Sequence, residues 1–169
     1  MRLFIAINFD QSILDALTDF QDDLRMQGVT GNYSRAENLH LTLAFIGEYG
    51  NSDAVLDAMG QVEFHPVEIG LDGVGSFGDL FWVGIKENPE LVSYVKRLRR
   101  ELAEHGIPYD KKRFSPHITL TRKASYRNGR LIPVEDAPKG YMTATRVFLM
   151  KSERGKQGMI YTEIADDQS

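Results

Sequence analysis

The stretch His40-Leu41-Thr42-Leu43 recurs 77 positions later as His117-Ile118-Thr119-Leu120. Each half of the chain reads strand, helix, loop and strand, with the same separation between the first strand and the histidine. The same shift places Leu3-Phe4 on Leu80-Phe81 and Leu14 on Leu91. Self-similarity at a fixed spacing indicates a repeated structural unit, and two copies are too few for a solenoid. The repeat therefore predicts two pseudo-symmetric lobes, with one histidine motif in each.

Each motif suits a β-strand with two different faces. Residues i and i+2 of a strand lie on the same side, so His40 and Thr42 share one face, as do His117 and Thr119. The aliphatic residues between them face the opposite side, where a hydrophobic core would cover them. Each strand is thus expected to present an imidazole and a hydroxyl together on its polar face.

Other patterns predict the remaining elements. The expected strands cover residues 3–9, 39–46, 114–121, 144–150 and 159–164, with hairpin strands within 67–85 and a loop over 126–140. The expected helices run from Asp10 to Gly28, from Asn51-Ser52 onward, and from Asn88-Pro89 to Gly106. Asp10, Asn51 and Asn88 are good N-cap residues, and a glycine commonly follows the last turn of a helix.

Length and composition limit the class of protein. The chain has 169 residues, of which 42% are hydrophobic and 26% charged, as in globular proteins. This length favours a single domain over residues 1–169. The absence of cysteine excludes disulfides, thiolate metal sites and cysteine nucleophiles. The apolar start of the chain is too short to span a membrane, so we expect a first strand in a cytoplasmic protein.

The paired histidines suit in-line displacement at phosphorus. Such a reaction needs a base on the attacking side and an acid on the leaving side, and two facing imidazoles supply both. Histidine has a reference pKa of ~6.5, so one ring can be neutral while the other is protonated. The hydroxyls of Thr42 and Thr119 can donate to the non-bridging phosphate oxygens. A metal site is the competing interpretation, but neither motif has a second histidine or a carboxylate two to four residues on.

Charge is distributed unevenly. The net charge is -4, yet residues 111–130 contain no Asp or Glu. The basic residues of this block are Lys111, Lys112, Arg113, Arg122, Lys123, Arg127 and Arg130. A basic block beside a catalytic histidine predicts a rim that gathers phosphate. Aromatic residues that could stack on bases are Tyr33, Phe77, Phe81, Phe114 and Tyr126.

The two other histidines lack a threonine partner. His105 precedes Gly106 at the end of a predicted helix, where a cation is favourable. His65 precedes Pro66. We expect neither to act directly in the chemistry.

Three segments resemble the two-histidine (2H) phosphoesterases, and within them the RNA 2′,3′-cyclic phosphodiesterases, also known as 2′-5′ RNA ligases. They are Arg2-Leu3-Phe4-Ile5-Ala6-Ile7, Glu37-Asn38-Leu39-His40-Leu41-Thr42-Leu43-Ala44-Phe45-Ile46-Gly47, and Phe114-Ser115-Pro116-His117-Ile118-Thr119-Leu120-Thr121-Arg122. Order and spacing agree over nearly the whole chain. The resemblance implies a bilobal α+β fold with pseudo-two-fold symmetry, antiparallel sheets lining a central cleft, and helices on the outer faces.

The resemblance also implies a reaction and roles for residues. The reaction is metal-independent hydrolysis of an RNA 2′,3′-cyclic phosphate to a 2′-phosphate, with no cofactor and with reversible 2′-5′ ligation at the same site. By position, His40 is implied to be the proton donor and His117 the proton acceptor. Thr42 and Thr119 would hold phosphate oxygens, and Arg122 would bind substrate. From the basic block, we expect Arg113 to bind substrate as well. The implied partner is RNA with cyclic phosphate ends, tRNA fragments among them, and we expect a monomer without an obligate protein partner or membrane.

Three alternatives stay open at this point. The first is a phosphodiesterase for another cyclic or 2′-5′-linked nucleotide. The second is a non-catalytic RNA-binding module in which the histidines only position phosphate. The third is a small α+β interaction protein with the two histidines on separate surfaces.

Overall fold

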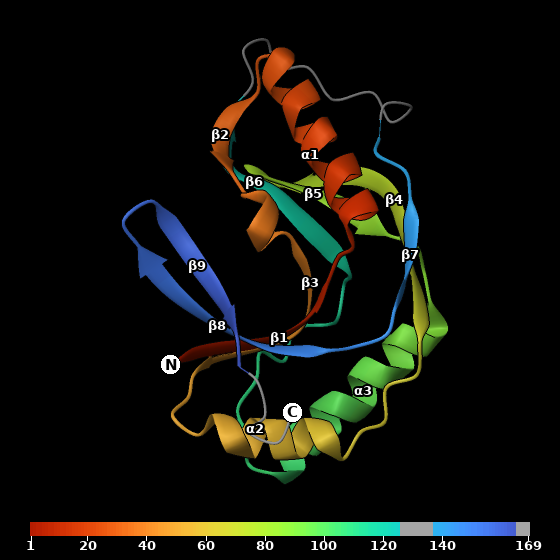
Figure 1. The fold of residues 1–169 in the computed structure, drawn as a ribbon, viewed down its shortest axis with the longest axis vertical. Coiled ribbons are helices and arrows are strands. Elements are labelled where there is room, and N and C mark those ends of the chain that lie inside the picture. The colour runs from red at the N-terminus through yellow and green to blue at the C-terminus, as the bar shows by residue number, and fades with distance from the viewer. Residues whose placement is uncertain (126–136, 165–169) are drawn as a thin grey trace.

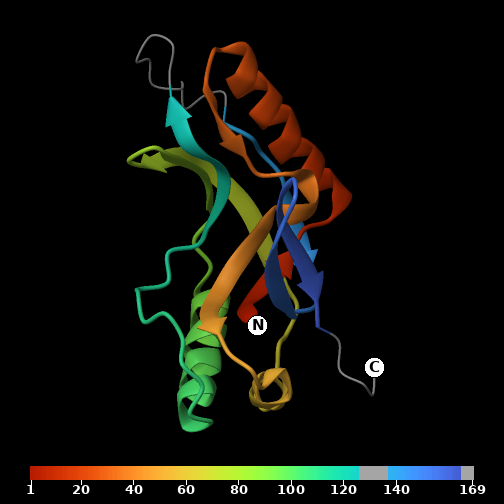
Figure 2. The same ribbon diagram turned by 90° about the vertical axis from the view of Figure 1, so that its left-hand side faces the viewer.

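The strands in the described part of the protein form two antiparallel sheets (Figures 1 and 2). The computed structural model describes residues 1–125 and 137–164. The four-stranded sheet has the order β3-β1-β8-β9 and the five-stranded sheet the order β2-β6-β5-β4-β7. The strands are β1 (Arg2–Asn8), β2 (Thr30–Tyr33), β3 (His40–Glu48), β4 (Val67–Phe77), β5 (Leu80–Ile85), β6 (His117–Ser125), β7 (Tyr141–Ala144), β8 (Phe148–Gly155) and β9 (Gly158–Glu163). The helices are α1 (Gln11–Met26), α2 (Ser52–Gly60) and α3 (Pro89–Glu104), with a short 3-10 turn η1 (Ala36–Asn38). The α+β prediction with antiparallel sheets is confirmed.

The two long helices start and stop as the sequence predicted. The Asp10 carboxylate accepts a hydrogen bond from the Ile13 amide at 3.0 Å, and the side-chain oxygen of Asn88 accepts one from the Leu91 amide at 3.3 Å. Beyond their last turns, Gly28 and Gly106 adopt positive φ angles of 89° and 70°. Glycine takes up this conformation without steric cost, so both ends are well defined.

Each long helix follows a strand of one sheet in the chain and packs on the other sheet. The helix α1 follows β1 of the four-stranded sheet but lies across the five-stranded one (Figure 1). The helix α3 follows β5 of the five-stranded sheet but lies beside α2 and β3. Because of this exchange, one continuous hydrophobic core contains residues from both sheets and all three helices.

Both motif strands contain a β-bulge at the same place. Between β1 and β3, Ile5 lies opposite Ala44 and Ala6 opposite Thr42, so Leu43 is the extra residue. Between β5 and β6, Phe81 lies opposite Thr121 and Trp82 opposite Thr119, so Leu120 is the extra residue. A bulge increases the local twist and re-aims the neighbouring side chains.

The uniform shift of 77 residues holds for the motif strands and fails by one residue elsewhere. The buried faces of α1 and α3 match at a shift of 78, which pairs Ile13 with Leu91 and Leu17 with Val95. The strands β1 and β5 match at a shift of 76. Ile5 lies opposite Ala44, and Phe81 lies opposite Thr121, which is the equivalent of Ala44 at the shift of 77. The matches of Leu3-Phe4 with Leu80-Phe81 and of Leu14 with Leu91 were therefore wrong.

Three element predictions also differ from the structure. The expected strand at 114–121 begins only at His117, because Pro116 lacks the amide hydrogen that a ladder needs. The expected strand at 144–150 is two strands in different sheets, since β7 ends at Ala144 and β8 begins at Phe148. The strand β2 was not among the predicted strands. Residues 126–136 of the expected loop lie outside the described residues.

No helix in the described ranges has the length and apolar character needed to cross a membrane.

Candidate active site

Both histidine motifs line one cavity of about 450 Å³ between the two sheets. His40 and Thr42 reach it from the start of β3, and His117 and Thr119 from the start of β6. Their aliphatic neighbours Leu41, Leu43, Ile118 and Leu120 are fully buried on the opposite faces. The alternation in each motif therefore brings two imidazoles and two hydroxyls to a single space.

Three arginines give this cavity a positive lining. Arg122 comes from β6, whereas Arg2 comes from β1 and Arg154 from β8. The other lining residues are Phe4, Ser34, Asn38, Phe45, Ser152, Met159 and Tyr161, so no acidic residue of the described chain lines the cavity. In a chain with a net charge of -4, the arrangement creates a local anion site.

The basic block contributes less than the sequence suggested. Of its described members, only Arg122 lines the cavity, while Arg113 is exposed and is not among the lining residues. Arg127 and Arg130 lie outside the described residues. Sequence reasoning missed Arg2 and Arg154. The sequence did carry a signal for Arg2. Successive residues of a strand face opposite sides, so a buried Leu3 places Arg2 on the side away from the core.

His40 is held by hydrogen bonds on both ring nitrogens. Its Nδ1 lies 2.7 Å from the Asn38 carbonyl oxygen, and its Nε2 lies 2.8 Å from the Thr42 hydroxyl. A carbonyl only accepts, so Nδ1 carries a hydrogen and donates it. The ring also packs against Phe4 and Tyr161, with centroid separations of 4.8 and 5.3 Å. The neutral ring therefore accepts from Thr42 at Nε2, and the protonated ring donates to it.

Burial lowers the pKa of His40 below its ordinary value of 6.5. Loss of hydration is the largest cause, because it disfavours the charged ring. The hydrogen bond to the Asn38 carbonyl opposes this change, and the positive charge of Arg122 adds to it. An anion that neutralised Arg122 would remove part of the cause and would itself favour the protonated ring.

His117 makes the same backbone contact as His40. Its Nδ1 lies 2.6 Å from the Ser115 carbonyl oxygen, again two residues before the histidine. Phe77 lies edge-on to the ring at a centroid distance of 5.5 Å, and Trp82 lies at 6.2 Å. Since Nδ1 donates to the backbone in both rings, Nε2 is the nitrogen left for chemistry in each.

A second hollow of about 360 Å³ also borders His117. Phe77 and Trp82 form its aromatic wall, and Phe77 is 54% exposed. The indole of Trp82 lies so close to Gly75 that a Cβ there would overlap it. Of the other aromatic candidates, Phe81 is buried, Tyr33 and Phe114 pack against the core, and Tyr126 lies outside the described residues. Phe77 is thus the candidate that remains available to a ligand at this hollow.

The two other histidines lie away from this cavity. His105 caps α3, with Nδ1 3.0 Å from the Glu101 carbonyl oxygen. His65 is exposed beside Glu63, 3.7 Å from its carboxylate. Within residues 1–125 and 137–164, no group of three or more histidines and carboxylates is arranged to hold a metal ion.

The chain is similar in sequence and structure to known proteins. A family model described as the 2′-5′ RNA ligase superfamily matches residues 13–156. The chain is 34% identical over 130 residues to an RNA 2′,3′-cyclic phosphodiesterase of Archaeoglobus fulgidus, covering 72% of each chain. It is 30% identical over 181 residues to an RNA 2′,3′-cyclic phosphodiesterase of Methanothermobacter thermautotrophicus, covering 97% and 96%. A crystal structure of E. coli LigT complexed with 3′-AMP has a TM-score of 0.82 and 28% identity, covering 97% of this chain and 95% of that one.

Proposed function

The chain belongs to the 2′-5′ RNA ligase superfamily, and from that premise we propose that it hydrolyses RNA 2′,3′-cyclic phosphate ends to 2′-phosphate ends by general acid-base catalysis. One observation carries the proposal: both histidine motifs and three arginines line the same cavity. The relatives named RNA 2′,3′-cyclic phosphodiesterase support the choice of substrate. We treat residues 1–169 as one catalytic domain.

The chemistry requires a proton transfer on each side of phosphorus. His117 Nε2 takes a proton from the attacking water, whose oxygen forms a new bond to phosphorus. The bond from phosphorus to the 3′ oxygen breaks, and His40 Nε2 gives that oxygen its proton. The products are a 2′-phosphate and a 3′-hydroxyl. The labels of donor and acceptor follow the family resemblance, because the two near-identical motifs do not assign these roles themselves.

Thr42 links the protonation of His40 to phosphate binding. In the free protein, protonated His40 donates Nε2–H to the Thr42 oxygen across the 2.8 Å contact, and in the reaction this hydrogen bond is exchanged for one to the leaving 3′ oxygen. The hydroxyl hydrogen of Thr42 is then free to donate to a phosphate oxygen. Arg122, Arg2 and Arg154 supply positive charge for the phosphate and for the developing negative charge. These cations provide electrostatic stabilisation from the chain's own side chains.

The hollow beside His117 favours an RNA end over a cyclic mononucleotide. A nucleotide next to the scissile phosphate would bring a second base close to Phe77, and aromatic rings stack on bases of any sequence. A non-catalytic RNA-binding module is the alternative, because the same arginines would also hold phosphate. We further expect a monomer that acts in the cytoplasm on RNA ends such as those of tRNA fragments.

The deciding experiment uses an RNA oligonucleotide with a 2′,3′-cyclic phosphate end. We expect a 2′-phosphate product, identified by phosphorus NMR, and activity that persists in EDTA. The variants His40→Ala and His117→Ala should stay folded, bind the RNA, and lose turnover by about 10²–10⁴-fold. A 3′-phosphate product, or complete loss in EDTA with recovery on adding a divalent metal, would contradict this mechanism. Unchanged turnover in both histidine variants would favour the binding module.

Ligation tests the same site with a different nucleophile. A 5′-hydroxyl of a second RNA replaces water, its oxygen bonds to phosphorus, and the 3′ oxygen leaves as before, which makes a 2′-5′ linkage. Both histidine variants should lose ligation and hydrolysis together. Loss of only one reaction would show that they do not share one acid-base pair.

A further inference from the structure

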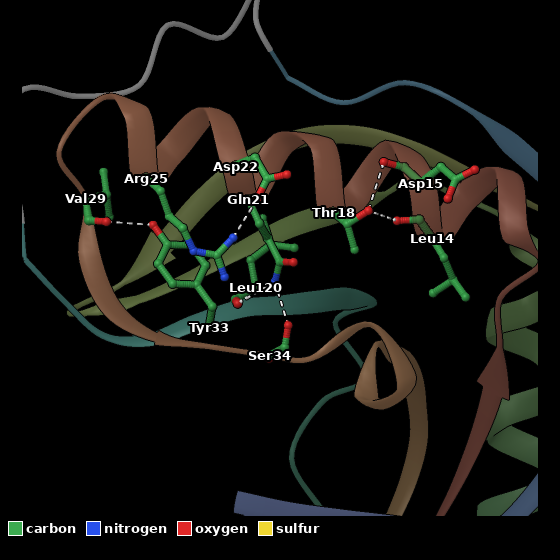
Figure 3. A network of polar contacts seen from close by, with 10 residues as sticks. All are labelled: Leu14, Asp15, Thr18, Gln21, Asp22, Arg25, Val29, Tyr33, Ser34 and Leu120. Carbon is green, nitrogen blue, oxygen red and sulfur yellow. Dashed lines mark hydrogen bonds and ion pairs between the residues drawn. The ribbon is translucent and has the colours of Figure 1, made fainter. Parts of the chain in front are cut away.

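Two polar side chains, one on each long helix, bind the backbone at the bulges that follow the histidine motifs. On α1, Gln21 Nε2 donates to the Leu120 carbonyl oxygen at 3.0 Å and to the Ser34 carbonyl oxygen at 2.9 Å (Figure 3). On α3, Arg99 Nη2 donates to the Leu43 carbonyl oxygen at 3.2 Å and Nη1 to the Lys112 carbonyl oxygen at 2.7 Å. Leu43 and Leu120 are the extra residues of the two bulges.

The position of Gln21 calls for an explanation other than packing. It lies on the buried face of α1 and is only 3% exposed, among residues that are otherwise apolar. Burying an amide is costly unless it is hydrogen-bonded, and an apolar side chain would fill the same space. The Leu120 carbonyl already accepts a hydrogen bond from the Ser34 amide, so Gln21 is a second donor that fixes the same carbonyl from α1.

These contacts lie one residue from the catalytic threonines. Leu120 follows Thr119, and Leu43 follows Thr42. Ser34 extends the clamp on β6, since its amide donates to the Leu120 carbonyl at 2.8 Å and its hydroxyl to the Thr119 carbonyl at 3.1 Å. Gln21 therefore joins β2 to β6 at the point where the bulge sets the direction of the His117 and Thr119 side chains.

The two clamps are equivalent and crossed. Gln21 and Arg99 occupy matching positions on the two helices, as shown by the match of Phe20 with Leu98 on their buried faces. Yet α1 comes from the half of the chain that contains His40, and it holds the strand of His117. The helix α3 follows β5 and holds the strand of His40. Each half of the chain thus fixes the motif of the other half.

We propose that Gln21 and Arg99 are positioning residues, Gln21 for the His117–Thr119 pair and Arg99 for the His40–Thr42 pair. They act through the bulge carbonyls and do not touch the substrate. Their effect on turnover rests on the proposed function, whereas their effect on ring orientation does not. The two effects can therefore be measured separately.

The first experiment observes the imidazoles by NMR in protein labelled at histidine, with and without inorganic phosphate. Gln21→Met removes both donors at nearly the same volume, and Arg99→Met keeps the aliphatic stem. We expect Gln21→Met to shift the ring signals of His117 and leave those of His40 nearly unchanged, and Arg99→Met to do the reverse. Thr18→Ala on α1 is the matched control, since the Thr18 hydroxyl bonds to carbonyls of its own helix (Figure 3).

The second experiment measures turnover of the cyclic phosphate RNA. Misplaced catalytic groups should lower kcat by about tenfold or more and leave KM within about twofold, because binding depends mainly on the arginines. Arg99→Gln, which restores an amide donor like that of Gln21, should recover part of the loss seen in Arg99→Met. Gln21→Leu is also apolar and has no donor, and it serves if Gln21→Met fails to fold.

The outcomes separate the inference from the proposed function. Crossed NMR shifts in a protein without cyclic phosphodiesterase activity would support the positioning roles and contradict the function. Equal shifts at both histidines, or no shifts at either, would overturn the positioning roles whatever the wild-type activity. If the wild type is active, a lower melting temperature with unchanged kcat would overturn them as well.

Discussion

At the scale of single residues, the tautomer of each imidazole follows from a local backbone contact. His40 and His117 both donate Nδ1–H to a carbonyl two residues earlier, at 2.7 and 2.6 Å. The contact lies within the motif segment itself, so the same local chain geometry produces it twice. As a result, Nε2 is the ring nitrogen without a backbone partner in both halves, and differences between the rings arise from their wider surroundings.

One such difference is the pKa of His40, which burial and Arg122 lower below 6.5. NMR titration of the free protein should therefore give His40 an apparent pKa below the reference value. Arg122→Gln should raise that pKa, because it removes a positive neighbour. Inorganic phosphate should raise it in the wild type and less in Arg122→Gln. A pKa at or above 6.5 in the free protein would contradict the burial argument.

The same shift predicts a dependence of stability on pH. The unfolded chain protonates His40 near pH 6.5, whereas the folded protein does so only at lower pH. Between these two pKa values, the unfolded state binds more protons than the folded state. This contribution to stability is therefore present above the unfolded pKa and is lost as pH falls through the folded pKa. Urea unfolding of wild type and His40→Gln across this range checks it. The variant should lose less stability on acidification, and equal slopes would refute the linkage.

Phe77 predicts a dependence on substrate length. Its exposed ring borders the hollow beside His117, and stacking of one base is worth about 1–3 kcal/mol. Phe77→Ala should raise KM for an RNA oligonucleotide and leave kcat/KM for a 2′,3′-cyclic mononucleotide nearly unchanged. Phe77→Tyr, which keeps a flat ring, serves as the control. An equal effect on both substrates would mean that Phe77 acts through its contact with His117 and does not stack on a second base.

Sequence predicted the residues of the site whose signal is local. The four motif residues and Arg122 lie within two short segments, and period-two alternation is enough to place them on one face. Arg154 was missed because its place depends on pairing between β1 and β8, which are about 150 residues apart in the chain. Arg113 shows the opposite case: it is near His117 in sequence, but the loop before β6 leaves it exposed outside the cavity lining, and its predicted contact with substrate stays a prediction.

At the scale of elements, the helices were predicted more closely than the strands. Capping is a contact between near neighbours, so Asp10, Asn51 and Asn88 could be recognised without tertiary information. Strand ends depend on partners that the sequence does not show. The change of sheet between Ala144 and Phe148 was missed for this reason, because apolar residues continue on both sides of it. The bulges were missed for the same reason. Each bulge places two successive residues on the buried side, which interrupts the alternation of buried and exposed residues.

The strand β8 carries a prediction through Arg154, which lines the cavity from outside both motif strands. Arg154→Gln should raise KM for RNA about threefold to tenfold and weaken its dependence on salt, since fewer cations then contact phosphate. The control is Lys96→Gln on the exposed face of α3, for which KM should stay unchanged. Arg113→Gln should have a smaller effect than Arg154→Gln. The opposite order would restore the sequence-based assignment of Arg113.

At the scale of the whole molecule, the exchange of helices ties the two sheets into one core. The buried faces of α1 and α3 belong to the same hydrophobic cluster as the strands of both sheets. A half that unfolded alone would remove a helix from the other half and expose its buried leucines. The two lobes are therefore expected to unfold together.

The single tryptophan makes this cooperativity measurable, because Trp82 lies on β5 and reports on the five-stranded sheet. Leu98 lies on α3, which packs with the four-stranded sheet, and it is fully buried. Leu98→Ala should cost about 2–5 kcal/mol of unfolding free energy. The urea midpoints from Trp82 fluorescence and from far-UV circular dichroism should fall by the same amount.

Met26→Ala is the control for that substitution, since Met26 is 86% exposed on α1 and should change stability by less than about 0.5 kcal/mol. Separate midpoints for the two probes in Leu98→Ala would mean that the five-stranded sheet survives loss of the other half. In that case each half would hold its own histidine in place, and the crossed helices would contribute packing without cooperativity. Coincident midpoints would mean that the two imidazoles are brought to one cavity by a single folding event.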